Sequence, residues 1–235
     1  MARAPGNRER KTEDFDMTEP DIYAVISQKG GSGKTTLVVN LAVEAFLTGR
    51  RTLILDVDPQ GSAATWGDLR DRPGPEVRIG IANRLAREIG IAAQQGFECI
   101  VIDTAGHASD AMVTAARLAR LALVPCRPQI FDLATMRASL DASLMAQTPA
   151  VTVFTAAPTR GHRLIDGARE ALAAEKAAVL PAMLKQRAAF AQSPTIGLGA
   201  SEFASGSPAA AEAGAFAGAI FAWPEPALSL VPKSS

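Results

Sequence analysis

The stretch ISQKGGSGKTT, residues 26–36, connects the apolar run IYAVIS (22–27) to a segment with helical periodicity. Gly30 and Gly31 stand directly before Ser32, and Gly33 lies between Ser32 and Lys34. Glycines at such a strand-to-helix junction let backbone N–H groups turn toward an anion, and the helix N-terminus adds its dipole. The stretch therefore predicts a phosphate-binding loop inside an α/β fold.

This loop departs from the strict pattern G-x-x-x-x-G-K-[ST], which needs a glycine six residues before the lysine. Counting back from Lys34 reaches Gln28, and a second lysine, Lys29, follows it. Two interpretations are open at this point: a damaged phosphate loop, or a different loop that needs two lysines. In either case Lys34 is placed to bridge the β- and γ-phosphates of a nucleotide, and the Thr35 hydroxyl to ligate Mg²⁺.

Short apolar runs alternate with longer amphipathic ones along residues 21–223, which is typical of βαβ units with a parallel sheet. We predict a single α/β domain over this range, with a mostly parallel, twisted sheet and helices on both faces. The candidate strands are 22–27, 52–58, 98–103, 121–126, 150–157 and 177–184. The candidate helices are 35–48, 79–95, 110–120, 132–146, 164–176 and 209–223.

Composition limits what surrounds this domain. Residues 1–20 mix basic and acidic side chains without an apolar run, and 224–235 are rich in Pro and Ser, so we expect a flexible arm and a flexible tail. The 24 basic residues balance the 24 acidic ones, so no overall field attracts nucleic acid or lipid. No run of 18 apolar residues predicts a membrane span. Cys99 and Cys126 lie in apolar runs, which suits reduced core residues of a cytoplasmic protein.

Carboxylates follow two more candidate strands. DVDPQ brings Asp56 and Asp58 to the end of one strand, and ECIVIDTAG brings Asp103 to the end of another. Carboxyl ends of parallel strands meet at one edge of the sheet, and neighbouring carboxylates repel unless a cation or water network shares them. The alternative interpretation is a pair of acidic residues that caps the next helix. Beside a phosphate loop, the metal-nucleotide interpretation is favoured.

Together, KGGSGKTT, DVDPQ and IVIDTAG resemble the ParA/MinD family of P-loop ATPases, which carry the deviant Walker A motif KGGxGKT[ST]. The resemblance extends to LVPCRPQIFDL (123–133) and is nearest to small ParA proteins of the ParF sort, which lack an N-terminal DNA-binding domain. It implies a P-loop NTPase fold that requires ATP and Mg²⁺ and hydrolyses ATP to ADP and phosphate.

The resemblance also implies roles for single residues. Lys29 reaches across a nucleotide-sandwich dimer to the partner's ATP, Asp58 orients the attacking water, and Asp56 and Asp103 order the Mg²⁺ shell together with Thr35. The catalytic set is then Lys29, Lys34 and Asp58. The nucleotide cradle is Lys29, Gly30, Gly31, Ser32, Gly33, Lys34, Thr35 and Thr36, where Thr36 contacts the α-phosphate.

Two further sets of residues follow from the same resemblance. Ala157 and Pro158, at the end of a strand, are placed beside the adenine. A basic set in the C-terminal half is placed on DNA, although each member also fits a solvated helix-face charge. These residues are Arg160, Arg163, Arg169, Lys185 and Arg187.

The function implied is plasmid or DNA partition by an ATP-dependent homodimer, or a larger assembly, that binds nucleoid DNA non-specifically. A ParB-like or ParG-like centromere-binding protein would stimulate it. Two alternatives stay open: the same switch could position a protein assembly, such as a chemoreceptor cluster or a DNA-transfer complex, or the protein could be a nucleotide-dependent scaffold without useful turnover. Segment 209–223 lacks the basic residues of MinD-type membrane helices, so core packing explains it better.

Overall fold

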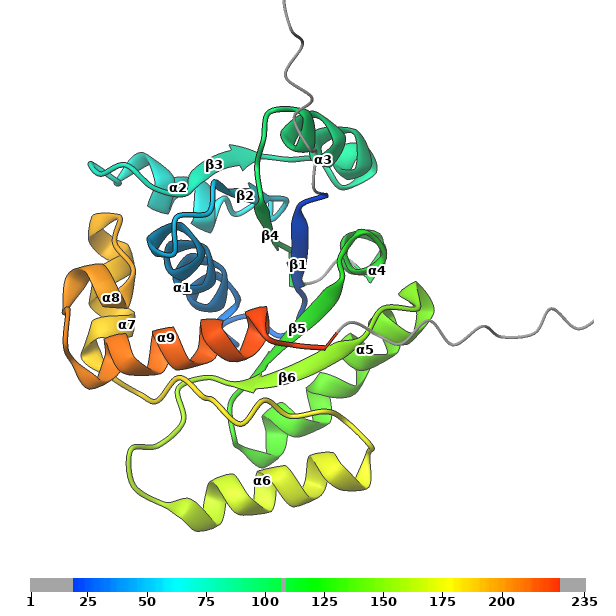
Figure 1. The fold of residues 1–235 in the computed structure, drawn as a ribbon. Helices are drawn as coiled ribbons and strands as arrows, with labels where there is room; N and C mark the ends of the chain where they lie inside the picture. The colour runs from blue at the N-terminus through cyan, green and yellow to red at the C-terminus, as the bar shows by residue number, and fades with distance from the viewer. Residues whose placement is uncertain (1–18, 107–108, 225–235) are drawn as a thin grey trace, which may run out of the picture.

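Six parallel strands form the centre of the molecule, in the order β3-β2-β4-β1-β5-β6 (Figure 1). The computed structural model describes residues 19–106 and 109–224, so the predicted arm and tail lie almost entirely outside it. The predicted parallel α/β fold is confirmed. The strands are β1 (Asp21–Val25), β2 (Thr52–Asp56), β3 (Glu76–Ile79), β4 (Cys99–Asp103), β5 (Leu121–Cys126) and β6 (Ala150–Phe154).

Helices cover both faces of this sheet. The longer ones are α1 (Lys34–Leu47), α3 (Leu85–Gln94), α4 (Ser109–Leu118), α5 (Ile130–Ala146), α6 (His162–Ala174) and α9 (Pro208–Phe221). The shorter ones are α2 (Ser62–Asp68), α7 (Ala188–Gln192) and α8 (Ala200–Phe203), with 3-10 turns η1 (Ala82–Arg84) and η2 (Ser193–Ile196). In the described residues, no helix is both long enough and apolar enough to span a bilayer.

The strands are apolar on both faces because each face is covered by a layer of helices. Along β1, Tyr23 and Val25 enter one core cluster, whereas Ala24 and Ile26 enter the other. This alternation is the two-residue period of a strand, and a strand buried on both sides reads as a continuous apolar run. The first cluster packs α1, α2, α7, α8 and α9 on one face, and the second packs α3, α4, α5 and α6 on the other.

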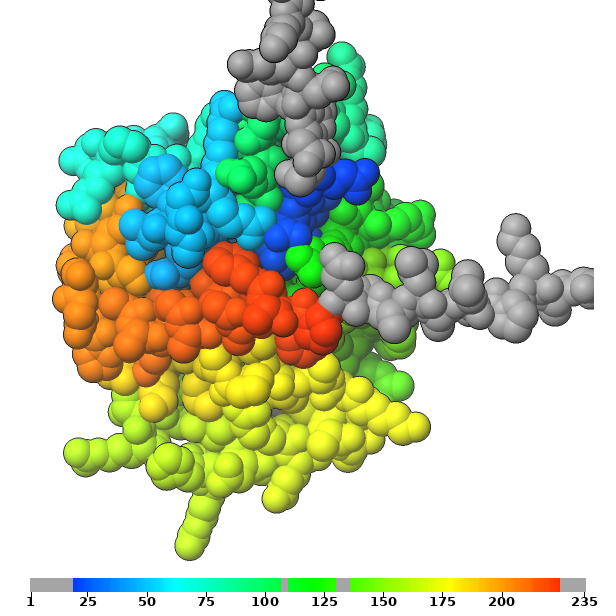
Figure 2. Space-filling model, viewed as in Figure 1, coloured from blue at the N-terminus to red at the C-terminus, as the bar shows by residue number. Residues whose placement is uncertain are grey.

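Helix α9 is the outer element of the first layer. It lies against α1, and in the space-filling view it crosses this face of the molecule between α1 and the segment 177–187 (Figure 2). Its Phe216 and Ile220 are fully buried. The expectation that segment 209–223 packs into the core is therefore confirmed.

Strand β1 holds the position in the sheet that matters most for a site. It lies between β4 and β5, because the chain runs from β1 to one side of the sheet and later returns to the other side. Ligands of open α/β sheets bind at the carboxyl ends of strands where this reversal occurs. The loop that follows β1 starts at this point.

One predicted strand is wrong. Segment 177–184 is extended and runs beside β6, but it makes only one isolated bridge, Thr152 to Val179, and a second bridge, Ala157 to Lys185, follows it. Pro181 in its middle has no N–H to donate, and a residue without a donor interrupts a regular ladder. The segment therefore lines the edge of the sheet as a strap and not as a seventh strand.

The predicted helix 79–95 begins too early, because Glu76–Ile79 is the edge strand β3. The run EVRI is short and partly exposed, so its apolar pattern is weak. Helices α2, α7 and α8 were also not predicted. They are four to seven residues long, too short for the 3.6-residue period to be recognised.

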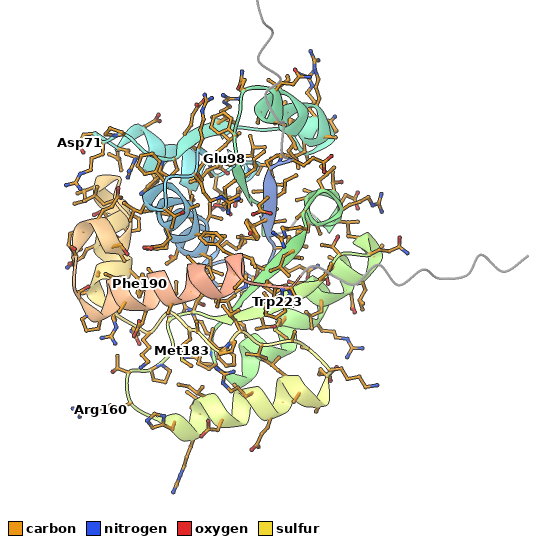
Figure 3. All side chains as sticks on the ribbon, in the orientation of Figure 1. Asp71, Glu98, Arg160, Met183, Phe190 and Trp223 are labelled. Carbon is orange, nitrogen blue, oxygen red and sulfur yellow. The ribbon has the colours of Figure 1, made fainter. Side chains whose placement is uncertain are left out.

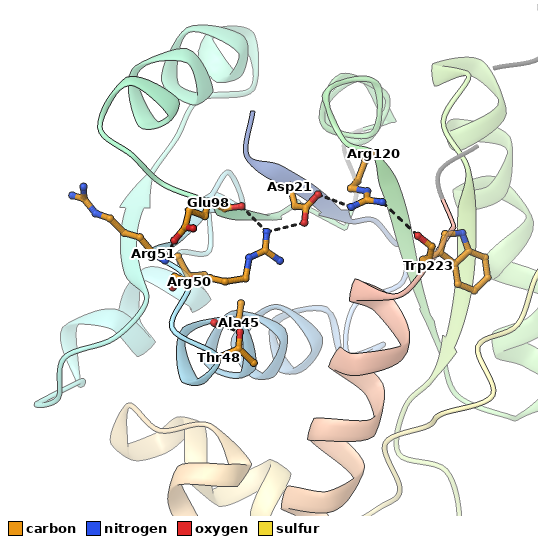
Figure 4. A network of polar contacts seen from close by, with 9 residues as sticks. Asp21, Ala45, Thr48, Arg50, Arg51, Glu98, Arg120 and Trp223 are labelled. Carbon is orange, nitrogen blue, oxygen red and sulfur yellow. Dashed lines mark hydrogen bonds and ion pairs between the residues drawn. The ribbon is translucent and has the colours of Figure 1, made fainter. Parts of the chain in front are cut away.

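A polar network connects the C-terminal end of α9 to the start of β1 (Figure 4). The Asp21 carboxylate accepts hydrogen bonds from Arg50 at 2.7 Å and from Arg120 at 2.5 Å. Arg120 also donates to the Trp223 carbonyl at 3.4 Å. Because cations are favoured at helix C-termini, this network stabilises the C-terminal end of α9, the outer helix of the first layer.

A buried ion pair joins α2 to the C-terminal helices. The Arg70 guanidinium donates to both Glu202 oxygens, at 2.9 and 2.6 Å, and the two side chains are only 4% and 7% exposed. Arg70 also donates to the Gly197 carbonyl at 2.9 Å, and its guanidinium lies 5.1 Å from the Trp66 ring centre. The pair therefore connects the segment after β2 to α8.

Replacing Glu202 with Ala is expected to lower the free energy of unfolding by about 3–5 kcal/mol, because it leaves the Arg70 charge buried without its partner. The measurement is urea-induced unfolding followed by circular dichroism. Glu175→Ala is the matched control: its pair with Arg137 is more than half exposed and should cost less than about 1 kcal/mol. Equal losses of unfolding free energy in the two variants would show that the buried Arg70–Glu202 pair contributes no more to stability than an exposed pair.

Candidate functional site

The loop after β1 is shaped by close backbone contact with the end of β6. Gly33, the residue before α1, has φ +96°, and a Cβ added there would lie 3.2 Å from the Thr155 side chain. Gly31 also has a positive φ of +69°. An L side chain is strained at such angles, so glycine is required at Gly33 for both conformation and space. The loop therefore begins α1 with its backbone close to the sheet.

Three side chains from other elements hold the loop from outside. Thr155 Oγ1 donates to the Ser32 carbonyl at 2.7 Å, and Ser139 Oγ accepts from the Gln28 N–H at 3.3 Å. Arg127 Nη2 donates to the Gly31 carbonyl at 2.7 Å. These bonds satisfy outward-facing backbone groups, so the loop is supported in its conformation by the scaffold.

Lys34, the first residue of α1, lies over the loop. Its Nζ is 3.5 Å from the Lys29 carbonyl, and a Cβ on Gly106 would lie 3.2 Å from the same Nζ. A side chain at Gly106 would therefore crowd the Lys34 ammonium group. The ammonium group of Lys34 is thus held between the loop and the residues that follow Asp103.

Asp103, the last residue of β4, faces the start of α1. Its Oδ2 accepts a hydrogen bond from Thr35 Oγ1 at 2.9 Å, whereas its buried Oδ1 has no hydrogen-bond partner among the described residues. Burial, assisted by the nearby charge of Asp56 and opposed by the hydrogen bond from Thr35, raises the pKa of the Asp103 carboxyl to about 7. A buried carboxylate oxygen without a partner is costly, and a bound cation is one way to satisfy it.

Asp56 is buried at the end of β2 and accepts two backbone hydrogen bonds. Its Oδ1 accepts from the Asp58 N–H at 3.0 Å, and its Oδ2 accepts from the Ala64 N–H at 2.8 Å. Burial raises the pKa of this carboxyl, and the backbone donors oppose the rise. Asp56 therefore fixes the turn into α2, which is the capping role that the sequence left as an alternative, and it lies beside Asp103 in the register of β2 and β4.

The loop encloses part of a cavity of about 560 Å³, within the range of roughly 300–1,000 Å³ that is usual for small-molecule sites. Asp56 and Asp103 are not among its lining residues. Lys34, Thr35 and Asp58 come together on its walls. Lys29 is not among the lining residues. The full lining is Gly30, Gly31, Gly33, Lys34, Thr35, Thr36, Asp58, Pro59, Gln60, Ser62, Ala105, Gly106 and Arg127.

A second, smaller cavity of about 220 Å³ adjoins the first. Its walls come from the end of β6 and the strap and α7 that follow α6. Ala156 in this wall has φ +46°, which is uncommon for a residue with a side chain and is found at functional sites. The lining is Ser32, Gly33, Thr36, Arg127, Thr155, Ala156, Leu184, Lys185, Gln186, Arg187, Phe190 and Ala191.

The residues predicted beside adenine are placed differently from their neighbours. Ala157 is fully buried in the core, and neither it nor Pro158 lines the two cavities. Thr155 and Ala156, just before them, do line the smaller one. The contact of Ala157 and Pro158 with a base stays a prediction. The smaller cavity, lined by Thr155 and Ala156, lies beside them.

The predicted basic set is spread over the surface below β6. Arg160 and Arg163 are exposed, and Arg160 extends from the loop before α6 (Figure 3). Arg169 donates to the Pro181 carbonyl at 3.0 Å. Lys185 lines the smaller cavity, and Arg187 pairs with Glu212 at 2.6 Å. The five residues do not form one patch of unpaired charge.

The oxygen ligands available at the loop fit a Mg²⁺ ion that keeps part of its water shell better than a metal held by protein side chains alone. In the part of the chain that the structure describes, no cluster of three or more His, Cys, Asp or Glu side chains could hold a metal. Mg²⁺ usually keeps several waters and takes one or two carboxylates plus substrate phosphates. The Thr35 hydroxyl and the unpartnered Asp103 Oδ1 suit that arrangement.

Two residues of this site were missed in the sequence. Thr155 donates a hydrogen bond to the Ser32 carbonyl and crowds the position of a side chain at Gly33. Arg127 lines both cavities. The available signal was their position: Arg127 directly follows the candidate strand 121–126, and Thr155 lies near the end of the candidate strand 150–157, at the edge where the phosphate loop was expected. The sequence separations from the loop, 123 and 96 residues, leave no local pattern.

Comparison with known proteins gives a family match over residues 23–198. The matching family is described as the CobQ/CobB/MinD/ParA nucleotide binding domain. The match spans β1 to η2 and therefore includes the loop, the three carboxylates and both cavities.

Curated relatives match over shorter stretches. A maintenance of carboxysome distribution protein A from Gloeobacter kilaueensis is 35% identical over 127 residues, which is 50% of this chain and 54% of the relative. A chromosome partitioning protein ParA from Myxococcus xanthus is 50% identical over 44 residues, or 19% of this chain and 16% of the relative. The matched part thus spans about half of the first relative's length and a sixth of the second's.

Among solved structures, the septum site-determining protein MinD from Pyrococcus horikoshii, complexed with Mg-ADP, superimposes with a TM-score of 0.67. The alignment covers 86% of this chain and 96% of that chain at 18% identity. At this identity the likeness shows a shared fold.

Replacing Asp103 with Asn should raise the thermal unfolding midpoint of the nucleotide-free protein more at pH 8 than at pH 6. The folded-state pKa of about 7 lies above the ordinary value of 3.8, so the stability contributed by this carboxyl falls as pH rises from 4 to 7 and is lowest above 7. Asn removes the buried charge and still accepts from Thr35. Each kcal/mol recovered corresponds to about 2–4 °C.

Differential scanning fluorimetry at the two pH values measures this difference. Asp68→Asn, which changes an exposed carboxylate on α2, is the control and should alter the midpoint little at either pH. A gain for Asp103→Asn that is the same at pH 6 and pH 8 would contradict the assignment of a desolvated charge at Asp103.

Proposed function

The chain belongs to the CobQ/CobB/MinD/ParA nucleotide-binding domain family, and from this premise we propose that it is a Mg²⁺-dependent ATPase that switches between monomer and dimer. The observation that carries the proposal is the contact of Thr35 with Asp103 beneath the cavity of the KGGSGKTT loop. A threonine hydroxyl and a strand-end carboxylate at this place are what a metal-bound nucleotide requires.

Nucleotide binding is assigned to the loop and the two cavities. Backbone N–H groups of residues 30–34 surround the β-phosphate, and the Lys34 ammonium contacts the β- and γ-phosphates. Thr36, which lines both cavities, contacts the α-phosphate. The base then occupies the smaller cavity, between Ala156 and the strap.

The metal site consists of few protein groups. Thr35 would ligate Mg²⁺ directly, and Asp103 and Asp56 would hold its water shell. When bound, the ion neutralises charge on the phosphate oxygens. Asp103 gains most from this arrangement, because its buried Oδ1 then acquires a partner.

Hydrolysis is assigned to Asp58 and Lys29. Asp58 lines the larger cavity near the end of the loop and would orient the attacking water. Lys29 lies at the start of the loop, before its glycines, but does not line the cavity of its own chain. A lysine at the site but outside its walls suits contact with the nucleotide of a second copy, where it neutralises charge that develops in the transition state, as an arginine finger does.

The process we propose for this switch is DNA partition. The relatives include a chromosome partitioning protein ParA, and the ATP-bound dimer would bind nucleoid DNA non-specifically while a ParB-like or ParG-like partner stimulates turnover. Arg160 and Arg163 are exposed and contribute most to such a surface. Arg187 contributes less, since its guanidinium is already engaged by Glu212.

A second candidate function is positioning of a protein assembly by the same switch. The observation that favours it is the 35% identity to a carboxysome distribution protein, together with the dispersed basic residues. A nucleotide-dependent scaffold without useful turnover is the remaining alternative, and the placement of Asp58 in the cavity wall argues against it.

Two lysine variants separate binding from the dimeric function. Lys34→Ala should lose MgATP binding, because it removes the charge that contacts two phosphates. Lys29→Ala should bind MgATP within about threefold of the parent and lose ATP-dependent dimerisation and hydrolysis. Titration calorimetry measures the affinity, and phosphate release measures turnover.

Lys176→Ala serves as the matched control, since this exposed lysine lies at the end of α6, remote from the loop. It should bind and turn over ATP as the parent does. A Lys29→Ala variant with unchanged dimerisation and turnover would return the loop to an ordinary phosphate site.

A salt-dependent DNA-retention assay separates the two processes. For a partition ATPase, retention of non-specific duplex should be at least about tenfold greater in ATP than in ADP and should fall steeply with salt, because phosphate contacts release counterions. A double change of Arg160 and Arg163 to Ala should reduce the slope, whereas Arg87→Ala on α3 should not. Equal, negligible retention in ATP and ADP would exclude the DNA model and favour positioning on another track.

A further inference from the structure

Arg127 is the first residue after β5, at the same edge of the sheet as the phosphate loop. Its backbone is fixed: the carbonyl accepts from the Gln129 N–H at 2.7 Å, and Pro128 beside it is buried. Its side chain is exposed and crosses to the loop, where Nη2 donates to the Gly31 carbonyl. A rigid backbone therefore presents a long cationic side chain at the site.

The guanidinium lies where the two cavities meet. Among the described residues, three line both of them: Gly33, Thr36 and Arg127. Gly33 and Thr36 belong to the loop and α1, so Arg127 is the residue that closes the junction from β5, the strand beside β1. A molecule that extends from the smaller cavity into the larger one must pass this guanidinium.

The electrostatic state of Arg127 is also informative. Within the described residues it makes no ion pair with a carboxylate, and its side chain makes one hydrogen bond, to Gly31. A guanidinium carries five N–H donors, so most of its donors are available to a ligand. Its planar, charged group suits phosphate oxygens and ribose hydroxyls.

We propose that Arg127 is a nucleotide-binding residue that contacts the phosphate chain at its α-phosphate end, opposite Thr36. This inference rests on the proposed function, because it requires a nucleotide in the two cavities. The α-phosphate end follows from position: Lys34, Thr35 and Asp58 line only the larger cavity, where the terminal phosphate and the metal belong. Arg127, at the junction, lies on the base side of them.

The bond to Gly31 gives Arg127 a second effect. By holding the Gly31 carbonyl, the guanidinium connects the loop to the end of β5 before any nucleotide binds. Contact with the phosphate then joins loop, strand and ligand through one side chain. Arg127 therefore aligns the phosphate chain and takes no part in the bond that breaks.

Titration calorimetry of the full chain with MgATP and with MgADP tests this assignment. Arg127→Ala should weaken both nucleotides by the same factor, about tenfold to a hundredfold, as for loss of a hydrogen bond to a charged group. The parent's affinity should fall with salt more steeply than that of the variant, since the lost contact is screened by ions. Arg87→Ala, an exposed arginine on α3, is the matched control and should leave both affinities unchanged.

Two conservative variants separate phosphate binding from support of the loop. Arg127→Lys keeps the charge and should recover part of the affinity, whereas Arg127→Gln keeps a donor for Gly31 without charge and should not. Parental affinity in Arg127→Gln, or in Arg127→Ala, would overturn the inference. A loss confined to MgATP would also overturn it, because that result would place the guanidinium at the terminal phosphate.

The failure of this inference differs from failure of the proposed function. A parent protein that binds neither MgATP nor MgADP would refute the nucleotide site itself. A parent that binds both nucleotides, with Arg127→Ala binding them equally well, would refute only the role of Arg127.

Discussion

The hydrogen bond from Thr35 Oγ1 to Asp103 Oδ2, 2.9 Å long, is the interaction on which the candidate site depends. It joins the first turn of α1 to the end of β4, the neighbour of β1 in the sheet. The bond orients a buried carboxylate whose other oxygen has no partner and whose pKa burial raises to about 7. The fold thus keeps a desolvated negative group beneath a phosphate loop, which costs stability until a cation offsets it.

The same arrangement connects the site to elements far along the chain. Asp56 holds the Ala64 N–H at the start of α2, and Arg70 after α2 forms the buried pair with Glu202 on α8. Asn40 on α1 donates to the Thr36 carbonyl at 2.8 Å and accepts from the Ala200 N–H at 2.9 Å. The C-terminal helices therefore pack directly on the two segments that carry the phosphate-contacting and carboxylate residues.

Much of the fold could be predicted from the sequence because its signals are local. The glycines of the loop, the apolar runs of the buried strands and the carboxylates at their ends lie within a few residues of each other, so the ends of β1, β2 and β4 were predicted to within two residues. The edge strand β3 and the strap 177–184 could not be predicted in this way, because their backbone conformation depends on the strands that lie beside them. The contacts of Thr155 and Arg127 with the loop are non-local, and only the assembled sheet brings them there.

We propose that this loop and its carboxylates form a nucleotide-controlled switch between monomer and dimer. The mass of an Asp58→Ala variant, measured by light scattering with Mg²⁺ and either ATP or ADP, tests this switch. This variant should bind ATP without hydrolysing it, so we expect twice the monomer mass in ATP and the monomer mass in ADP. A monomer in both nucleotides, with ATP binding shown in the same sample, would contradict it.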